Sequence, residues 1–204
     1  MISLPNVQKI QNLLVGHLAA RTNWDEAPEL FTIHQLDAGP PALMRVPVPN
    51  ELWAAYGHPP TAVANLASLA LQLPRHPDGQ HMLLLDDAPL IGAAFRYEAY
   101  AISEDYDHPA AREAARRRAA GGSTPRFETI PGRIEQRCIT AVDTDGGRYM
   151  ASASRISEQG TDASEPNVTY LAFSDPRRDK LTGNVVDATN RFLNAVKPVR
   201  ATKP

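Results

Sequence analysis

Two strand patterns on either side of a charged segment constrain the fold of this chain more than any other feature. The first pattern predicts a hairpin that pairs His81–Leu85 with Leu90–Ile102. The second predicts a hairpin that pairs Arg133–Asp143 with Arg148–Ile156. Two-residue alternation of apolar and polar residues is typical of antiparallel strands that have one wetter face. An antiparallel sheet with an excursion between its two hairpins is therefore the expected scaffold.

Helical periodicity in the remaining segments predicts helices that cover this sheet. Apolar residues recur there at three- and four-residue spacing, which is typical of a helix with one buried face. Strands and helices do not alternate regularly, so the pattern favours the α+β class over a parallel doubly wound sheet. Helices are expected at Asn6–Ala20, Asn50–Tyr56, Thr61–Leu73 and Asn184–Val196, and further strands at Leu30–Leu36, Ala42–Val48 and Val168–Phe173.

These elements predict a single domain. We expect a mainly antiparallel sheet of about five to seven strands, packed by N-terminal, central and C-terminal helices. The α+β domain is expected to span residues 1–198, with a charged helical insertion at 104–128 and a flexible tail at 199–204. Pro47 and Pro49 confine the strand Ala42–Val48 to an edge of the sheet, because proline has no N–H to donate.

The charge balance and the single cysteine exclude several classes of function. The chain carries a net charge of −2, whereas dedicated nucleic-acid and anionic-membrane binders concentrate positive charge. Cys138 is the only cysteine, which excludes an internal disulfide and a thiolate metal cluster and predicts a small buried strand residue. No apolar run approaches the roughly 18 residues of a membrane span, and the residues after Met1 lack a signal-peptide pattern. A cytoplasmic protein without a membrane segment is expected.

Short motifs of catalysis and cofactor binding are absent from the sequence. It contains no phosphate-binding loop, no dinucleotide-binding glycine pattern, no nucleophile elbow and no zinc-protease helix motif. The six histidines lie apart, and none has metal-ligand spacing to another. No local motif therefore indicates a catalytic residue, a cofactor or a metal site, and we expect none.

An acidic stretch follows the strand Leu90–Ile102. Glu104, Asp105, Asp107 and His108 offer three carboxylates and an imidazole within five residues. A calcium loop of the EF-hand type requires acids at alternate positions, a central glycine and a distal glutamate. The stretch lacks that glycine and that register. A solvated strand end and a helix cap are favoured instead, with Asp107 as the cap ahead of a proline.

The segment Pro109–Ala120 predicts a surface helix that carries the candidate binding residues. Its alanines give it a high helix propensity, but apart from alanine it has no apolar stripe. Glu113 lies four residues before Arg117, which is a favourable spacing for an ion pair. A solvated helix and an arginine surface for an acidic partner both fit this pattern. The candidate partner-binding residues are Arg112, Arg116, Arg117 and Arg118.

The distribution of charge favours the binding hypothesis. Residues 86–108 carry six acids and one arginine, a local charge of −5, whereas residues 112–137 carry seven arginines and three glutamates, a local charge of +4. Opposed patches this close in sequence pair either within the molecule or, in a homo-oligomer, between subunits. Exposed ion pairs contribute about 0–1 kcal/mol each, so they would serve the choice of partner and not the stability of the fold.

A catalytic alternative places acid–base chemistry on the wetter face of the strand Leu90–Ile102. Glu98, Tyr100 and Arg96 share that face, and His81 is expected on the neighbouring strand. A carboxylate, an imidazole and an arginine on one face are groups that serve acid–base catalysis. Cross-strand charge pairing accounts for the same residues without any chemistry.

Three functions therefore stay open. The leading hypothesis is a non-enzymatic binding or assembly protein that presents the arginine-rich insertion to a protein partner or to a second copy of itself. The alternative is a small hydrolase or transferase that has a sheet-face site under the insertion as a lid. Nucleic-acid association through the same arginines is favoured less, because no aromatic residues lie between them.

The predicted layout of helices around a sheet is loosely similar to that of small bacterial secretion-chaperone-like domains. The composition, rich in alanine and proline and poor in lysine, resembles that of many short proteins of actinobacteria and their phages. These resemblances imply an accessory protein of such a bacterium or phage, and they assign no role to any residue.

Overall fold

The computed structural model confirms the α+β class, and its described part holds one six-stranded antiparallel sheet and five helices. It describes residues 4–36, 39–56, 58–75, 81, 83–84, 88–102, 108–120, 129–130, 133–155, 168–175 and 181–198, so the predicted tail at 199–204 lies outside the described residues. The helices are α1 (Leu4–Ala19), α2 (Asn50–Tyr56), α3 (Pro59–Ala70), α4 (Pro109–Ala119) and α5 (Asn184–Val196). The strands are β1 (Glu29–Gln35), β2 (Pro41–Arg45), β3 (Leu90–Ile102), β4 (Arg133–Asp143), β5 (Arg148–Ser154) and β6 (Val168–Ser174).

The strands follow the order β2-β1-β3-β4-β5-β6, and every neighbouring pair is antiparallel. β3 and β4 lie at the centre and pair along eleven residues, from Gly92↔Asp143 to Ile102↔Arg133. β4 and β5 form the second predicted hairpin. β2 lies at an edge of the sheet, as the prolines that follow it predict.

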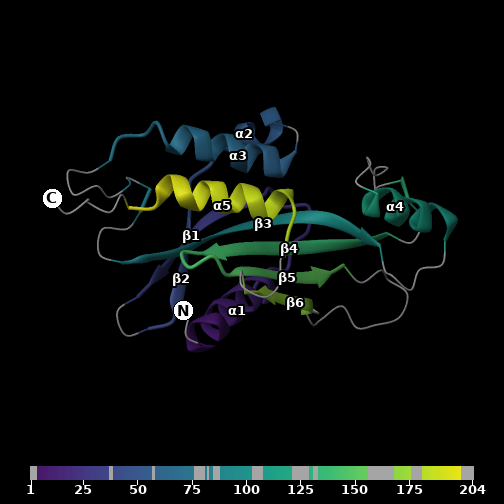
Figure 1. Cartoon of the computed structure of the whole chain (residues 1–204), viewed down its shortest axis with the longest axis horizontal. Coiled ribbons are helices and arrows are strands. Elements are labelled where there is room, and N and C mark those ends of the chain that lie inside the picture. Colours follow the sequence, from purple (N-terminus) through teal and green to yellow (C-terminus); the bar gives the residue numbers. More distant parts are fainter. Residues whose placement is uncertain are drawn as a thin grey trace.

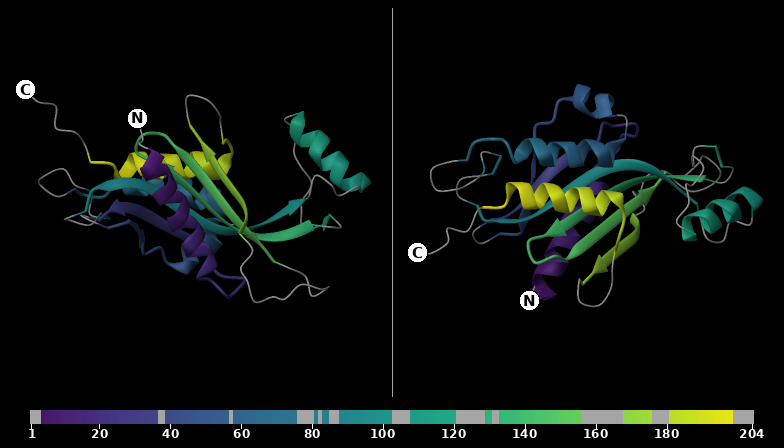
Figure 2. Two further views of the ribbon diagram at one scale, coloured as in Figure 1. Left: turned by 90° about the horizontal axis from the view of Figure 1, so that it is seen from below. Right: turned by 45° about the horizontal axis from the view of Figure 1, so that its top comes forward.

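Helices cover both faces of the sheet (Figure 1, Figure 2). α1 lies on one face, where Ile10, Leu14 and Leu18 join a core with residues of β1, β3, β4 and β5. The small residues of β5 predict such a close neighbour. α2, α3 and α5 cover the opposite face, where a second core includes Phe95 of β3 and Phe192 of α5. Cys138 is buried in the sheet, as its neighbours predict.

The first predicted hairpin is wrong. Over Leu90–Arg96, next to the predicted turn, β3 pairs with β1, and from Gly92 onward it pairs with β4, so neither edge is left there for residues 81–85. His81 instead makes an isolated bridge with Arg75, and its buried imidazole lies 2.8 Å from the carbonyl oxygen of Ala70. Leu84 is buried in the core that α3 and α5 share. A strand distant in sequence takes the place of the local partner, and six of the seven residues of this strand, β1, are buried.

The turn between β4 and β5 is organised by one buried carboxylate. Asp143 accepts the N–H groups of Asp145 at 2.9 Å and Gly147 at 2.8 Å, and it accepts the hydroxyl of Tyr149 at 2.6 Å. Burial raises the pKa of Asp143 in spite of these bonds. Gly146 adopts a φ of 91° at the turn, a conformation that glycine adopts without strain.

No helix among the described residues is long and apolar enough to cross a membrane.

Two glycines give a matched test of this packing. A Cβ on Gly92 would lie 2.7 Å from the carbonyl oxygen of Val142 in the neighbouring strand, whereas a Cβ on Gly16 of α1 would meet nothing within 4 Å. Gly92→Ala should therefore lower the free energy of unfolding by about 1–3 kcal/mol. Gly16→Ala should raise it by about 0.5–1 kcal/mol, because alanine is the better helix former. Urea unfolding of both variants checks the pair, and equal effects would contradict the close approach of β4 to Gly92 of β3.

Candidate functional site

The paired strands β3 and β4 extend beyond the helices on both faces of the sheet, and α4 lies in the connection between them at this outer end (Figure 1, Figure 2). α4 begins after His108, whose carbonyl oxygen accepts the N–H of Arg112 and whose Nδ1 accepts the N–H of Ala110, both at 3.1 Å. Pro109 is the first residue of the helix. Asp107, predicted as the cap, lies outside the described residues, and among the described ones His108 accepts these first N–H groups of the helix.

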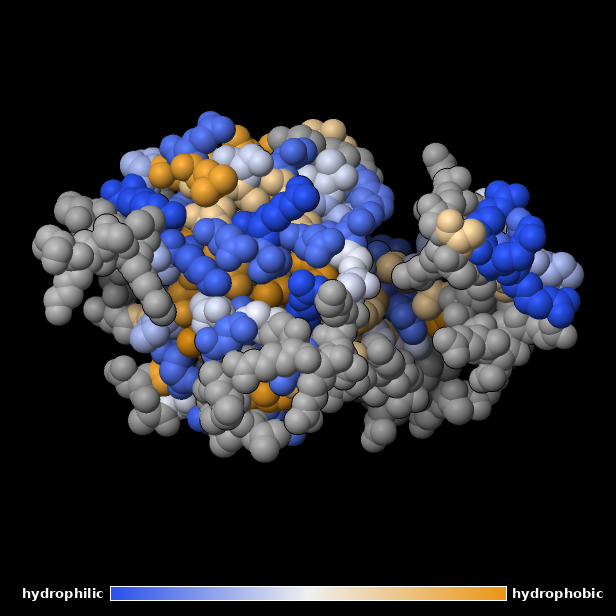
Figure 3. All heavy atoms as spheres, viewed as in Figure 1, coloured by the Kyte–Doolittle hydropathy of each residue, from blue (hydrophilic) through white to orange (hydrophobic). Residues whose placement is uncertain are grey.

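α4 lies outside both cores of the sheet. Its Ala111 and Ala114 are buried against Ile130, and Ala110 packs at the edge of this small third cluster. These contacts tether α4 to the returning chain without placing it in the hydrophobic interior. The face of α4 that the space-filling view shows is mostly hydrophilic (Figure 3). The surface position agrees with the alanine-rich pattern of the helix.

One glutamate organises two of the predicted arginines. Glu113 accepts two bonds from Arg116, at 2.6 and 3.0 Å, and one from Arg117, at 2.7 Å. These bonds lower the pKa of Glu113 and hold the two guanidinium groups side by side. Arg116 and Arg117 are 78% and 55% exposed, and Arg112 is exposed as well. The side chain of Arg118 lies outside the described residues, as do Glu104, Asp105 and Asp107.

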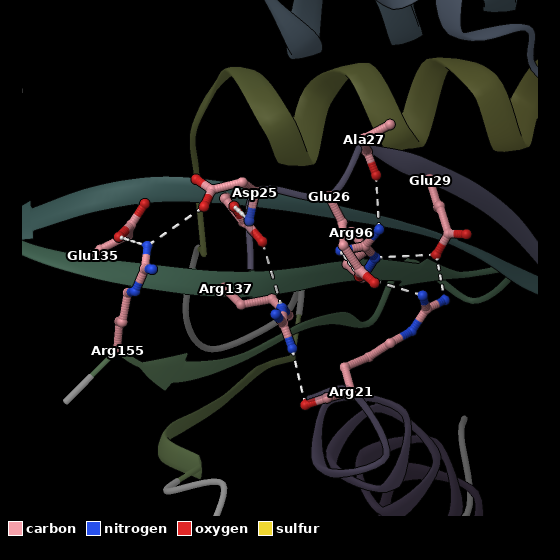
Figure 4. A network of polar contacts seen from close by, with 10 residues as sticks. Arg21, Asp25, Glu26, Ala27, Glu29, Arg96, Glu135, Arg137 and Arg155 are labelled. Carbon is pink, nitrogen blue, oxygen red and sulfur yellow. Dashed lines mark hydrogen bonds and ion pairs between the residues drawn. The ribbon is translucent and has the colours of Figure 1, made fainter. Parts of the chain in front are cut away.

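A network of charged side chains lies on the α1 face of the sheet, where α1 ends (Figure 4). The segment that connects α1 to β1, residues 21–28, crosses the sheet there, and we name it the strap. Arg96 of β3 is only 1% exposed and pairs with Glu29 at 3.0 Å and with Glu26 of the strap at 3.2 Å. Arg21 of the strap pairs with the same two glutamates, at 2.6 Å to Glu29 and 3.3 Å to Glu26.

Arg137 of β4 is the second buried arginine of this network. Its side chain is 3% exposed, lies 3.6 Å from Glu98 of β3 and donates to the carbonyl oxygen of Arg21 at 3.1 Å. The ring of Trp24 lies over its guanidinium, 4.6 Å from ring centroid to Cζ. Desolvation lowers the pKa of Arg137, and the Glu98 carboxylate opposes that shift. The strap thus binds the sheet through ion pairs and one aromatic ring.

The fit between the strap and the sheet is incomplete. Among the described residues, the buried side-chain atoms without a hydrogen-bond partner all belong to this region, on His17, Arg96, Glu98 and Arg137. Asp25 also has a φ of 61°, which is uncommon for a residue other than glycine. Its N–H donates to Glu98 Oε2 at 2.9 Å, a bond that holds the strained residue in place. Buried polar atoms of this kind are usually satisfied by ordered water.

Three carboxylates of the network are close enough to hold a cation. Ligand atoms of Asp25, Glu98 and Glu135 lie within 4.8 Å of one another. Arg155 lies 2.8 Å from Glu135 and 3.6 Å from Asp25, and Arg137 faces Glu98, so arginines already neutralise all three groups. A metal ion would have to displace these guanidinium groups. The cluster is therefore described more simply as a network of ion pairs.

The catalytic alternative lacks its imidazole, because His81 does not join Arg96, Glu98 and Tyr100 on their face of the sheet. Arg96, predicted on a wetter face, is buried in ion pairs, because the strap and α1 cover that part of the sheet. Glu98 faces Arg137, and Tyr100 lies farther along β3, where Arg133 stacks on its ring at 5.3 Å. His81 packs against α3, which covers the opposite face. The cross-strand charge pairing that the sequence also predicts accounts for Glu98.

The sequence patterns do not predict the contacts of the strap. Trp24, Asp25 and Glu26 belong to a segment without helical or strand periodicity, so their contacts with distant strands depend on the tertiary fold. One signal was available in the strands themselves. Arg96 and Arg137 stand at positions that continue the alternation of apolar, inward-facing residues such as Ala94 and Ile139, and a charge at such a position requires a partner.

No protein-family model, curated protein or solved structure matches this chain. Functional conclusions therefore depend on the side chains and their geometry alone.

The buried and the exposed ion pairs should respond differently to loss of one carboxylate. Glu29→Gln keeps the shape of the side chain but leaves buried Arg96 with a weaker set of partners, so it should lower the free energy of unfolding by about 3 kcal/mol. Glu113→Gln on α4 is the matched control, and it should leave the unfolding midpoint nearly unchanged because its partners are exposed. Chemical denaturation of both variants measures the difference. Equal losses would mean that solvent reaches Arg96.

His17 should make the fold sensitive to acid. Burial, with help from Arg21, lowers its pKa from 6.5 to about 4, and its ring lies edge-on to Phe31. Below pH 6.5 the unfolded chain therefore takes up a proton that the folded chain does not bind. Stability should fall as the pH falls from 6.5 towards 4, and this contribution should level off below 4. Thermal melting across this range should show a shallower decline for His17→Gln, and parallel profiles would contradict the burial of the imidazole.

Proposed function

We propose that this chain is a non-enzymatic binding protein whose α4 engages an acidic surface of a protein partner. The observation that carries the proposal is the position of α4, outside both cores and at the end of a long hairpin, with Arg112, Arg116 and Arg117 exposed. A helix that buries little but alanine contributes little to the stability of the fold. Its arginines are better explained by what they bind.

The ion pairs within α4 prepare two arginines for binding. Glu113 holds Arg116 and Arg117 through both Nε atoms and one Nη, which leaves their remaining N–H groups for the carboxylates of a partner. Guanidinium groups bind carboxylates through two parallel bonds when their orientation is fixed. The intramolecular bonds reduce the side-chain entropy that binding would otherwise cost.

Two features favour a protein partner over a nucleic acid. α4 contains no aromatic residue on which a base could stack, and the net charge of the chain is −2. We place this binding protein in the cytoplasm, where a free buried thiol such as Cys138 stays reduced.

A pair of double variants tests the role of α4. Arg116→Gln with Arg117→Gln removes two exposed charges from α4, and Lys9→Gln with Arg191→Gln removes two exposed charges from α1 and α5. Both pairs change the net charge equally and keep good helix formers. Affinity for a labelled polyglutamate peptide, measured by fluorescence anisotropy, should fall about 10-fold in the α4 variant and change little in the control, because the fixed guanidinium pair is lost.

Equal binding by the two double variants would refute the role of α4. Tighter binding of a single-stranded oligonucleotide of the same charge, lost in the α4 variant, would instead support the nucleic-acid alternative. Quantitative capture of proteins from a cytoplasmic extract, with the wild type and both variants, then asks whether a natural partner depends on the same arginines.

A further inference from the structure

Polar contacts, and not the hydrophobic cores, attach the strap to the domain (Figure 4). Neither core includes a residue between Leu18 of α1 and Leu30 of β1, and none of residues 21–28 is fully buried. Among the described residues, only one bond between backbone groups holds the strap, from the N–H of Arg21 to the carbonyl oxygen of Leu18 at 3.1 Å. A segment with few buried apolar contacts and few backbone hydrogen bonds opens at a smaller free-energy cost than the rest of a fold.

The side-chain contacts of the strap leave strain and unsatisfied groups in the closed form. Arg96 donates to the carbonyl oxygen of Ala27 at 2.7 Å, and Arg137 donates to that of Arg21 at 3.1 Å. Other nitrogen atoms of both arginines are buried without a hydrogen bond, and Asp25 keeps its φ of 61°. Opening of the strap relaxes the backbone of Asp25 and lets water bond the guanidinium groups. Both effects reduce the free energy that separates the open form from the closed one.

His17 lies in the last turn of α1, four residues before Arg21, and links the strap to pH. Its Nε2 is buried without a hydrogen-bond partner, and its ring lies edge-on to Phe31. Burial and then Arg21 lower the pKa of His17 to about 4, and charged groups of three strands act on it too. These groups are Glu29 of β1, which opposes the shift, and Arg96 of β3 and Arg137 of β4, which add to it. Opening takes Arg21 away and admits water, so the imidazole then binds a proton below pH 6.5, and acid favours the open form.

We infer that the strap, residues 21–28, opens as a unit while the sheet and its helices stay folded, and that acid favours this opening. The open form exposes the guanidinium groups of Arg96 and Arg137, whose side chains are 1% and 3% exposed in the closed form. The strap thus controls access to the charged face of the two central strands. This control is independent of α4, because the strap makes its contacts where α1 ends, whereas α4 lies at the outer end of β3 and β4.

Hydrogen exchange of the full chain, followed by NMR, tests this inference. The N–H of Asp25 donates to Glu98 and exchanges when the strap opens, whereas amides of the ladder between β3 and β4 exchange when the domain unfolds. At pH 7 the protection of the Asp25 amide should be at least about 100-fold lower than that of the ladder, and dilute urea should lower only the latter. From pH 7 to pH 5, after correction for the intrinsic rate, protection of the Asp25 amide should fall by up to about 20-fold, and His17→Gln should abolish this fall.

Two substitutions separate opening of the strap from unfolding of the domain. Glu26→Gln weakens a contact with Arg96 that only the closed form makes, so it should lower the protection of the Asp25 amide about 10-fold. Glu113→Gln removes the same charge from α4 and is the matched control, which should leave this protection unchanged. Gly92→Ala, in the body of the sheet, should lower the protection of the ladder and leave that of the Asp25 amide unchanged.

Equal protection of strap and ladder, or a joint loss of both in Gly92→Ala, would overturn the inference. A pH dependence that survives in His17→Gln would also do so. Should Gly92→Ala not fold, dilute urea gives the same comparison on the wild type. The Arg116→Gln, Arg117→Gln double variant should exchange like the wild type, which separates failure of this inference from failure of the proposed role of α4.

Discussion

The ladder between β3 and β4 is the constraint on which the rest of the structure depends. These central strands pair along eleven residues, but the helices cover only part of that length. Over the covered part, Phe95 and Ile139 point into the two cores. Over the outer part none of the described helices of the two layers packs on these strands, which carry polar and aromatic side chains and lead into α4. The length of one strand pair therefore sets both the stable body of the domain and its exposed end.

The transition between these two parts is marked by buried charge. Arg96 and Arg137 occupy inward positions at which an apolar residue would continue the core, and each depends on carboxylates for compensation. Ion pairs in such places contribute little net stability, but removal of one partner leaves an uncompensated charge. This asymmetry favours the observed position of the strap, which brings Glu26 to Arg96 and Trp24 over Arg137. The cost appears in the buried polar atoms that lack a hydrogen bond and in the backbone of Asp25.

Local pattern predicted the elements well where their own periodicity decides the structure. α2 and α5 have the predicted bounds, and the second hairpin pairs as expected, because its turn lies within the same short stretch of sequence. The hairpin predicted from residues 81–85 and 90–102 does not form, because β3 pairs with β1, a strand distant in sequence. The partner of a strand depends on which surfaces the whole chain can bury together. The contacts of the strap cannot be predicted from the sequence for the same reason. The arginines of α4 were predictable as a surface, since a helix rich in alanine and arginine has nothing to bury deeply.

Arginine has two uses in this chain, and burial decides between them. Arg96 and Arg137 are buried in the sheet, where carboxylates compensate them and they hold the strap in place. Arg116 and Arg117 of α4 stay exposed, and their pairs with Glu113 contribute little to stability. Positive charge that the fold does not need is what the proposed binding of an acidic partner would use.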